Sequence, residues 1–587
     1  MSATQTTAAQ QLARYNNDPG LALQVLRGIQ LQDNWISPDS LLEVSKGLGI
    51  RRARLSALIE FYSFLHAEPR GKFDLYLSDS ITDQMLGSRD TAETLQRELE
   101  LSAEGQSADG SVSLSMTSCT GLCEQGPALL VNGHAIQGVD RRRASEVAGL
   151  IRDGVPVDEW PADWKQIDDR ILKTGPLLES DLTRGAAIER AMRLGSHLAL
   201  AELEVAGLRG CGGAGFPTFR KWSLCHDADS DQRYVVCNAD EGEPGTFKDR
   251  ALLQLHAEAL LEGMTACAVT IGATKGYIYL RHEYEFLRDR LQQHIDARRR
   301  DGLLGRNLLG HHGTHFDIEI YMGAGSYVCG EETALLESLE AKRGIPRIRP
   351  PFPVTRGLWG KPTVVNNVET LCYAAGILER GASFTAHNGD EPGWKLLSIS
   401  GDCARPGIYE FPLGMAIADT LEACGATDVQ AIQVGGPGGE LISAAEFDRR
   451  LSFDDLNSGG SFIIFDASRD MLDVACNFTH FFAHESCGFC TPCRVGTKLM
   501  VQMADKVADG HGAHLDIEQI RRLNRVMTQA SHCGLGQQAA VPILSTFQKF
   551  AESFHRRMDD VEYKPAFDVD AAIERSRAIV REETSNP

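Results

Sequence analysis

Apolar side chains recur every three or four residues between about residues 8 and 70, and this period predicts helices. The spacing then changes, because Phe73, Leu75 and Leu77 alternate along the chain as the buried positions of a strand do. The pattern therefore predicts two successive parts, a helical segment and a small α/β domain, at 1–71 and 72–152.

A polar stretch with proline and aspartate at 153–175 is predicted to be a linker. The block at 176–385 is rich in glycine and alternates strand patterns with helical ones, which is typical of an α/β domain. Short strands and turns indicate a β-rich module at 394–455. A helical pattern returns at 469–560, and the charged residues 561–587 are predicted to form a tail. The expected fold class is α/β and multidomain.

The chain has 587 residues and a formal net charge of −21 at pH 7. Nucleic acids and anionic lipid are poor candidate partners for it, because both need a positive face. No apolar run reaches the roughly 18 residues of a membrane span. The first ten residues also lack the basic start and apolar core of a secretory signal. We therefore expect a soluble, cytoplasmic protein with no nucleic-acid or membrane partner.

Six of the fifteen cysteines are grouped, and four of these form the most specific motif of the sequence. Cys487, Cys490 and Cys493 follow C-x-x-C-x-x-C spacing, and Cys533 comes later in the chain. Three thiolates on one short loop with a remote fourth are typical of a Cys₄ [4Fe-4S] cluster. Zinc is the rival hypothesis, although structural zinc usually takes its ligands from two separated pairs. Ordinary buried cysteines are the second alternative, and most of the nine single cysteines are expected to be small buried apolar residues.

A glycine-rich loop at 208–216 contains the pattern G-x-G-x-x-G at Gly210, Gly212 and Gly215. The dinucleotide-binding fingerprint requires a strand before this pattern, whereas residues 196–207 have a helical pattern. The ordinary Rossmann interpretation therefore fails here. The remaining hypotheses are a loop whose backbone closely approaches a flat or phosphorylated ligand and a plain tight turn.

Three carboxylates, Asp240, Glu241 and Glu243, lie within four residues directly after a predicted strand. Carboxylates would repel a phosphate, so they suit sugar hydroxyls, amide donors or a water molecule. An ordinary acidic surface loop is the alternative.

The loop at 323–333 joins a predicted strand to a predicted helix, so it can present backbone N–H groups to an anion. Glu331 and Glu332 open that helix, and the helix dipole alone would favour them there. Asn366 and Asn367 supply paired amides able to contact phosphate or ribityl oxygens.

Five motifs together closely resemble those of the NADH-oxidising, FMN-binding subunit of respiratory complex I and its soluble relatives, over about residues 176–560. These motifs are L-R-G-x-G-G-A-G-F, C-N-A-D-E-G-E-P-G-T-F-K-D-R, G-A-G-x-Y-x-C-G-E-E-T-A-L, K-P-T-x-V-N-N-V-E-T and E-S-C-G-x-C-x-P-C-R-x-G. The resemblance implies a Rossmann-like FMN domain, a β-grasp module of the SLBB type and a helical bundle with one [4Fe-4S] cluster.

The resemblance also implies the binding residues. The FMN site would comprise Gly210, Gly212, Lys221, Asn238, Asp240, Glu241, Tyr327, Gly330, Glu331, Asn366, Asn367 and Thr370. NAD(H) would lie on the flavin beside Phe216, Glu243, Glu332 and Phe352, where the rings offer stacking faces. Acidic residues near the sugar favour NAD over NADP, because they would repel a 2′-phosphate.

Two positions depart from the family pattern. Cys211 stands where the family usually has Arg, which removes a positive charge near the nucleotide. Arg349 replaces the Lys that is common before Pro-Pro-Phe, which keeps the charge but changes the donor geometry.

The first 150 residues resemble the family's thioredoxin-like [2Fe-2S] subunit, here fused to the same chain. Cys119 and Cys123 match its second cysteine pair, whereas Ser78 and Asp83 stand at the positions of the first. A Cys₄ [2Fe-2S] cluster therefore cannot form, and we expect a scaffold and partner surface without it. A mixed Cys/Ser/Asp site is the alternative.

The fusion and the degenerate site most resemble the large diaphorase subunits of soluble NAD-reducing [NiFe]-hydrogenases. Such a subunit exchanges a hydride between NAD(H) and FMN and passes single electrons through the [4Fe-4S] cluster, with no acid–base residue required. Its implied partners are a small iron–sulfur diaphorase subunit and the [NiFe]-hydrogenase subunits. The alternatives are a flavin subunit of formate dehydrogenase or of complex I, and a flavin-free scaffold.

Overall fold

Four helices begin the described part of the chain, as the apolar spacing predicts. The structure is a computed structural model that describes residues 6–389, 391–558, 573–574, 576–578 and 580–581. At the start of the third helix the Ser37 hydroxyl accepts a hydrogen bond from the backbone N–H of Ser40, and Pro38 occupies the first turn. The helices are α1 (Thr7–Arg14), α2 (Ala22–Asp33), α3 (Pro38–Leu48) and α4 (Arg52–Ile59).

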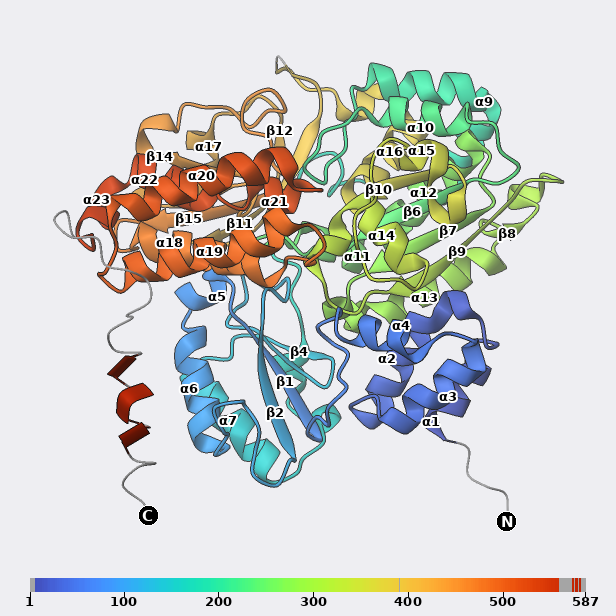
Figure 1. Ribbon diagram of the computed structural model, residues 1–587. Coiled ribbons are helices and arrows are strands. Elements are labelled where there is room, and N and C mark those ends of the chain that lie inside the picture. Colours follow the sequence, from blue (N-terminus) through green and yellow to red (C-terminus); the bar gives the residue numbers. More distant parts are fainter. Residues whose placement is uncertain (1–5, 390, 559–572, 575, 579, 582–587) are drawn as a thin grey trace, which may run out of the picture. The chain divides into compact units, whose positions relative to one another are not determined.

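The chain divides into two units, 1–468 and 469–587, and the first sheet of unit 1 has the strand order β2-β1-β3-β4 (Figure 1). β1 and β2 are parallel, and β3 is antiparallel to β1. Leu75, Leu77 and Val147 belong to the core of this part. Its elements are β1 (Phe73–Ser78), α5 (Ile81–Met85), α6 (Ser88–Glu98), β2 (Val112–Thr117), β3 (Leu129–Val131), β4 (His134–Ile136) and α7 (Arg141–Arg152).

A mainly parallel sheet of order β10-β6-β7-β9-β8 forms the centre of the glycine-rich block, and its edge strand β8 runs antiparallel (Figure 1). The alternation of strands and helices predicted for 176–385 is confirmed. The strands are β6 (Tyr234–Ala239), β7 (Lys275–Leu280), β8 (Gly305–Arg306), β9 (His315–Met322) and β10 (Thr363–Asn367). The helices are α9 (Ala186–Val205), α10 (Thr218–His226), α11 (Lys248–Leu255), α12 (Ala257–Ile271), α13 (Glu285–Arg300), α14 (Glu332–Leu339), α15 (Pro353–Arg356) and α16 (Val368–Arg380).

Different parts of the chain cover the two faces of this sheet. Val235 and Cys237 of β6 belong to a core formed with α9, α12 and α16. Val236 of the same strand belongs to a core formed with the N-terminal helices and α14. Alternate residues of a strand point to opposite faces, so β6 contributes to both cores. The N-terminal helices thus form a layer that packs on one face of this sheet.

The third sheet has the order β14-β13-β15-β11-β12-β5, with β11 and β15 parallel at its centre. It extends past the predicted end at 455. It also includes β5, which lies in the stretch predicted to be a linker. The elements are β5 (Ile171–Lys173), β11 (Trp394–Gly401), β12 (Gly407–Pro412), α17 (Ile417–Cys424), β13 (Val429–Val434), β14 (Glu440–Ser443) and β15 (Ser461–Asp466).

The side chain of Glu410 explains why the segment after β5 is ordered. Its carboxylate has no exposed surface and accepts hydrogen bonds from the backbone N–H groups of Gly175, Leu177 and Leu178 at 2.8–2.9 Å. The Tyr373 hydroxyl donates a fourth at 2.9 Å. One buried carboxylate therefore fixes the chain between the second and third sheets.

Unit 2 is helical in its described residues, as predicted. Phe478, Met500 and Ile520 are buried in it, and Lys506 forms a buried ion pair with Asp516 at 2.7 Å. No helix in the described parts of the chain is long and apolar enough to cross a membrane. Most of the predicted tail at 561–587 lies outside the described residues. The helices are α18 (Met471–His484), α19 (Thr491–Ala508), α20 (His514–Ala530), α21 (Gly534–Gln538), α22 (Val541–Lys549) and α23 (Ala551–His555).

We predict that Glu410→Gln destabilises unit 1 by about 3 kcal/mol, because an amide removes one acceptor and places N–H groups against backbone donors. The melting temperature should fall, and proteolytic cleavage near 171–178 should accelerate. Glu104→Gln, on an exposed residue, serves as the control. Equal melting and cleavage of both variants would contradict the proposed anchoring.

Candidate functional site

The predicted ligand-binding loops meet at the carboxyl ends of β6 and β10. Asn238 of β6 pairs in register with Asn367 of β10. The Asn238 side chain donates to the carbonyl oxygen of Gly330 at 2.8 Å and accepts from the N–H of Asp240 at 3.1 Å. The two strand ends therefore bring the acidic loop and the 323–333 loop together, at the edge where open α/β sheets bind ligands.

The glycine-rich loop follows helix α9, as predicted, and its backbone closes onto the same strand ends. The Cys211 N–H donates to the Thr370 hydroxyl at 2.9 Å. A Cβ built on Gly212 would lie 3.3 Å from the Cβ of Asn367, so little space remains there for a side chain. Gly210 donates its N–H to the carbonyl oxygen of Phe216 at 2.9 Å. The ring of Phe216 is 40% exposed and available for stacking.

The Cys211 thiol is buried in this loop. Burial raises its pKa to about 12, so it is neutral at ordinary pH. The residue thus behaves as a small apolar side chain where the family pattern has a cation.

The carboxylate of Glu241 is used inside the protein. It accepts hydrogen bonds from the N–H groups of Asp249 and Arg250, at the start of α11, and from the Tyr284 hydroxyl, all at 2.8–3.0 Å. Burial and the nearby Asp249 raise its pKa to about 7. Glu241 therefore fixes the acidic loop to a helix start.

Glu331 plays a similar local role at the start of α14. Its carboxylate accepts hydrogen bonds from the N–H groups of Thr333 and Ala334 at 2.9 Å, so it is the N-cap of the helix. One oxygen, Oε2, caps the helix, whereas the buried Oε1 has no hydrogen-bond partner among the described residues. A Cβ built on Gly330 would lie 3.3 Å from the carbonyl oxygen of Asp240.

Lys221 lies between two of the loops. Its ammonium group donates to the Glu332 carboxylate and to the carbonyl oxygen of Val365, both at 3.0 Å. Arg349 approaches the Glu332 carboxylate at 3.6 Å. The Asn366 side chain accepts from the Trp222 ring N–H at 2.9 Å. These contacts place the positive charges of Lys221 and Arg349 next to the 323–333 loop, and Lys221 also lies next to the strand end that carries Asn366.

Glu243 and Tyr327 join the acidic loop to the 323–333 loop. The Tyr327 hydroxyl donates to Glu243 Oε2 at 2.6 Å. Burial raises the pKa of Glu243 to about 7, and the tyrosine hydrogen bond opposes that rise. This carboxyl therefore changes charge near neutral pH.

Phe352 precedes α15, which packs against α10 and β10, and its ring is 51% exposed.

A network of buried charges was missed by the sequence analysis. Lys248 contacts Asp249 at 2.7 Å and Glu369 at 2.9 Å, and Lys395 contacts Glu369 at 2.6 Å. The Asn367 side chain donates to Asp249 at 2.6 Å. Lys248 and Asp249 belong to a quoted motif, but nothing in the sequence indicates that Lys395, in another sheet, completes the set.

Three of the four grouped cysteines of unit 2 lie at helix starts, and Cys487 lies in the loop between α18 and α19. Cys490 and Cys533 are the N-cap residues of α19 and α21, and Cys493 lies in the first turn of α19. Burial raises the pKa of Cys493 to about 12, and the charges of Cys487, Cys490 and Cys533 add to the rise, so the four thiols influence one another. Helix starts favour thiolates. The donor set fits a cluster.

No group of three or more His, Cys, Asp or Glu side chains in the described residues is arranged to hold a single metal ion. Zinc needs such a close set of ligands, whereas a cuboidal cluster spreads its four thiolates around a larger body.

The four residues of the degenerate site, Ser78, Asp83, Cys119 and Cys123, lie close together. The sulfur atoms of Cys119 and Cys123 are 3.5 Å apart and buried. The Asp83 carboxylate accepts from the hydroxyls of Ser78 at 2.5 Å and Ser80 at 2.7 Å and from a backbone N–H at 2.9 Å. Its two oxygens are thus already engaged within the protein. Burial raises the pKa of Asp83 to about 6.

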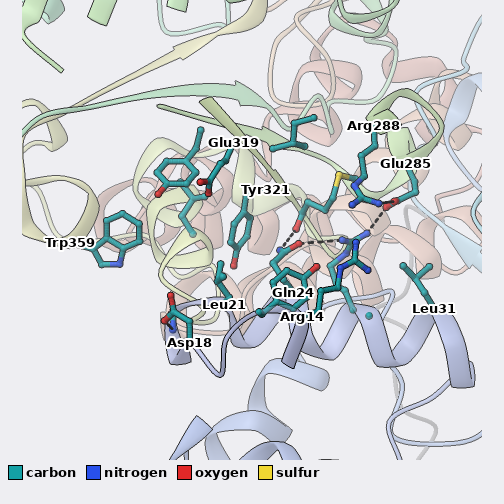
Figure 2. Close-up of a pocket in the computed structure, with 18 residues that line it drawn as sticks. Arg14, Asp18, Leu21, Gln24, Leu31, Glu285, Arg288, Glu319, Tyr321 and Trp359 are labelled. Atoms are coloured by element: carbon teal, nitrogen blue, oxygen red, sulfur yellow. Dashed lines mark hydrogen bonds and ion pairs between the residues drawn. The ribbon is translucent and has the colours of Figure 1, made fainter. Parts of the chain in front are cut away.

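A separate cavity of about 470 Å³ lies between α1–α2 and the sheet strands β7 and β9 (Figure 2). Gln24, Arg27 and Tyr321 are among its lining residues, and Arg27 forms an ion pair with Glu285 at 2.5 Å. None of the predicted cofactor-binding residues lines this cavity.

Three family models match the chain. They are the Nuo51 FMN-binding domain over residues 203–375, the NADH-ubiquinone oxidoreductase-F iron–sulfur binding region over 473–557, and the thioredoxin-like [2Fe-2S] ferredoxin over 8–152. The last match spans both the N-terminal helices and the first sheet.

The chain is similar to the α subunit of the NAD-reducing hydrogenase HoxS of Cupriavidus necator, with 37% identity over 96% of each chain. It is 40% identical to one subunit of the Escherichia coli NADH-quinone oxidoreductase, over 60% of this chain and 82% of that one. A crystal structure of NAD⁺-reducing [NiFe]-hydrogenase in the H₂-reduced state contains a chain with a TM-score of 0.87 and 37% identity, covering 98% of this chain and 97% of that one.

Proposed function

Because the chain belongs to the family of flavoprotein subunits that contains the α subunit of NAD-reducing hydrogenase, we propose that it is an NAD-dependent diaphorase subunit. When bound, FMN exchanges a hydride with NAD(H) and single electrons with a [4Fe-4S] cluster. The observation that supports this best is the meeting of three ligand-binding loops at the ends of β6 and β10.

The proposed FMN site uses backbone and amide groups more than charge. Gly212 permits close approach of the backbone, and Asn238 and Asn367 lie side by side at the strand ends. Lys221 supplies a positive charge for a phosphate. Glu241 and Glu331 hold the loops from behind, since their carboxylates already accept backbone hydrogen bonds. These residues would therefore bind and orient the flavin.

NAD(H) is proposed to lie between the exposed rings of Phe216 and Phe352 and the carboxylates of Glu243 and Glu332. The rings provide stacking area for the adenine. Ionised carboxylates accept hydrogen bonds from sugar hydroxyls and from a carboxamide.

The third sheet supports the β-grasp hypothesis for the module that starts at 394. Its central strands β11 and β15 are parallel, each is flanked by an antiparallel neighbour, and α17 connects the two hairpins. We propose that the module extends to Asp466.

The proposed partners are a small iron–sulfur subunit and the [NiFe]-hydrogenase subunits, in the cytoplasm. All fifteen cysteines are free thiols in the structure, which suits a reducing compartment. The hydrogenase assignment is favoured over complex I because similarity to the hydrogenase subunit extends through the fused N-terminal part, whereas the NADH-quinone oxidoreductase subunit matches 60% of the chain. Affinity purification should recover a nickel protein. Recovery of a molybdenum protein would support formate dehydrogenase instead.

We predict that Cys533→Ser lowers the iron content by about four per chain. Reduction of a small dye by NADH should stay within about twofold, because the flavin reacts with it directly, whereas electron transfer to the hydrogenase partner should fall at least about a hundredfold. Cys476→Ser, a buried non-ligand cysteine of the same unit, is the control. Unchanged iron in the Cys533 variant would refute the ligand assignment.

The purified wild-type chain should contain about one FMN and about four iron and four sulfide. We propose that the N-terminal site is empty because the Asp83 oxygens are already hydrogen-bonded. Cys119→Ser should therefore leave the iron content unchanged. A loss of about two iron would mean that a [2Fe-2S] cluster occupies this site.

The pKa of Glu243 predicts a pH dependence. Above pH 7 the carboxylate accepts hydrogen bonds from NADH, and below it protonation removes that acceptor. The value of kcat/KM for NADH should therefore fall about tenfold between pH 8 and pH 6. Tyr327→Phe should move the fall to higher pH, because the carboxylate loses a stabilising hydrogen bond. Glu243→Gln should flatten the profile, and an unchanged profile in that variant would exclude this group.

A further inference from the structure

Residues 119–124, here called the remnant loop, carry the two cysteines of the degenerate site and belong to the connection between β2 and β3. They contact the part of unit 1 that holds the proposed FMN site. The contacts involve the acidic loop around Glu241, although more than a hundred residues separate the two loops in sequence. They consist of three buried connections, and each has a different physical character.

The first connection is the guanidinium group of Arg281. One nitrogen donates to the carbonyl oxygen of Cys119 at 2.6 Å, and another donates to the carbonyl oxygen of Glu241. Arg281 is 4% exposed, and Glu283 balances its charge at 2.6 Å. A single planar group thus bridges the backbones of the two loops, which a lysine ammonium cannot reproduce.

The second connection is steric. A Cβ built on Gly121 would lie 2.2 Å from the Tyr284 hydroxyl oxygen and 2.6 Å from a ring carbon. The same hydroxyl donates to Glu241 Oε2 at 2.9 Å. The remnant loop therefore presses directly on the tyrosine that holds the Glu241 side chain.

The third connection is an ion pair between Arg250 and Glu124, whose side chains have no exposed surface. The backbone N–H of Arg250 also donates to Glu241 Oε2 at 3.0 Å. The Glu241 carboxylate is hydrogen-bonded by the start of α11 and by Tyr284, and the remnant loop contacts both of these partners.

We infer that the remnant loop positions Glu241 and its acidic loop for flavin binding, with Arg281 and Tyr284 as positioning residues. This inference rests on the proposed FMN site. It gives the N-terminal domain a role that needs no iron: the loop that carries the degenerate site sets the affinity and potential of the flavin.

The test uses Gly121→Ala in the full-length chain. The methyl group should displace Tyr284 and weaken FMN binding at least about tenfold, measured by fluorescence titration of the flavin-depleted chain. A matched control is Gly110→Ala. Gly110 lies in the same domain with φ +69° against +74° for Gly121, but a Cβ there meets nothing within 4 Å. Both glycines have a positive φ, so both substitutions strain the backbone, but only Gly121→Ala creates the clash.

The flavin midpoint potential is the second readout, because a general loss of stability would not change it in the folded fraction. A tenfold change in the relative affinity for oxidised and reduced flavin shifts a two-electron potential by about 30 mV. Tyr284→Phe should shift the potential without a clash. Arg281→Lys, which keeps the charge, should resemble Gly121→Ala rather than wild type.

Normal FMN affinity and potential in Gly121→Ala, Tyr284→Phe and Arg281→Lys would overturn the inference. If Gly121→Ala does not fold, Tyr284→Phe and Arg281→Lys decide it. Failure of the wild-type chain itself to bind FMN would instead refute the proposed function, and the inference with it. Binding by wild type and Gly110→Ala, with weakened binding or a shifted potential in the other three, would support both.

Discussion

The carboxylate of Glu369 has no exposed surface, and the ammonium groups of Lys248 and Lys395 compensate its charge at 2.9 and 2.6 Å. Burial opposes its ionisation, but these two cations hold its pKa below the usual value. The three residues come from α16, α11 and β11, so one charge cluster ties the strand ends of the parallel sheet to the third sheet. Removal of either cation would leave a buried charge only partly compensated, at a cost of about 3–5 kcal/mol.

Two kinds of carboxylate surround the proposed flavin site. Glu241 directs both of its oxygens to backbone N–H groups at a helix start, and Glu331 directs its Oε2 to such groups, so their charge stabilises the loops. Glu243 accepts hydrogen bonds from the Tyr327 hydroxyl and from the backbone of Gly438, and burial raises its pKa to about 7. In the proposed site, Glu241 therefore holds the acidic loop, whereas Glu243 is the carboxyl assigned to the nucleotide. Burial and the direction of neighbouring N–H groups decide which role each takes.

The strands of the parallel sheet and the spacing of the cluster cysteines could be predicted, because both depend on short-range pattern. Gly121 and Tyr284 could not be paired, since no local period connects residues from separate domains. The short strand β5 was assigned to a linker for a related reason. It has three residues, two of them exposed, and its order comes from β12 and from the Glu410 carboxylate far along the chain. Likewise, the capping roles of Glu241 and Glu331 depend on where helices begin, which sequence patterns locate poorly.

The pairing of β5 with β12 also constrains how the chain is made. About 230 residues separate the two strands, which at 5–20 residues per second corresponds to roughly 12–46 s of synthesis. During that interval β5 has no neighbour to pair with, while the parallel sheet between them is completed. When β12 has been synthesised, β5 is already present and pairs with the outer edge of β12. The outer edge of β12 is therefore covered only when β5 is present, and a fragment that began at residue 394 would expose that edge.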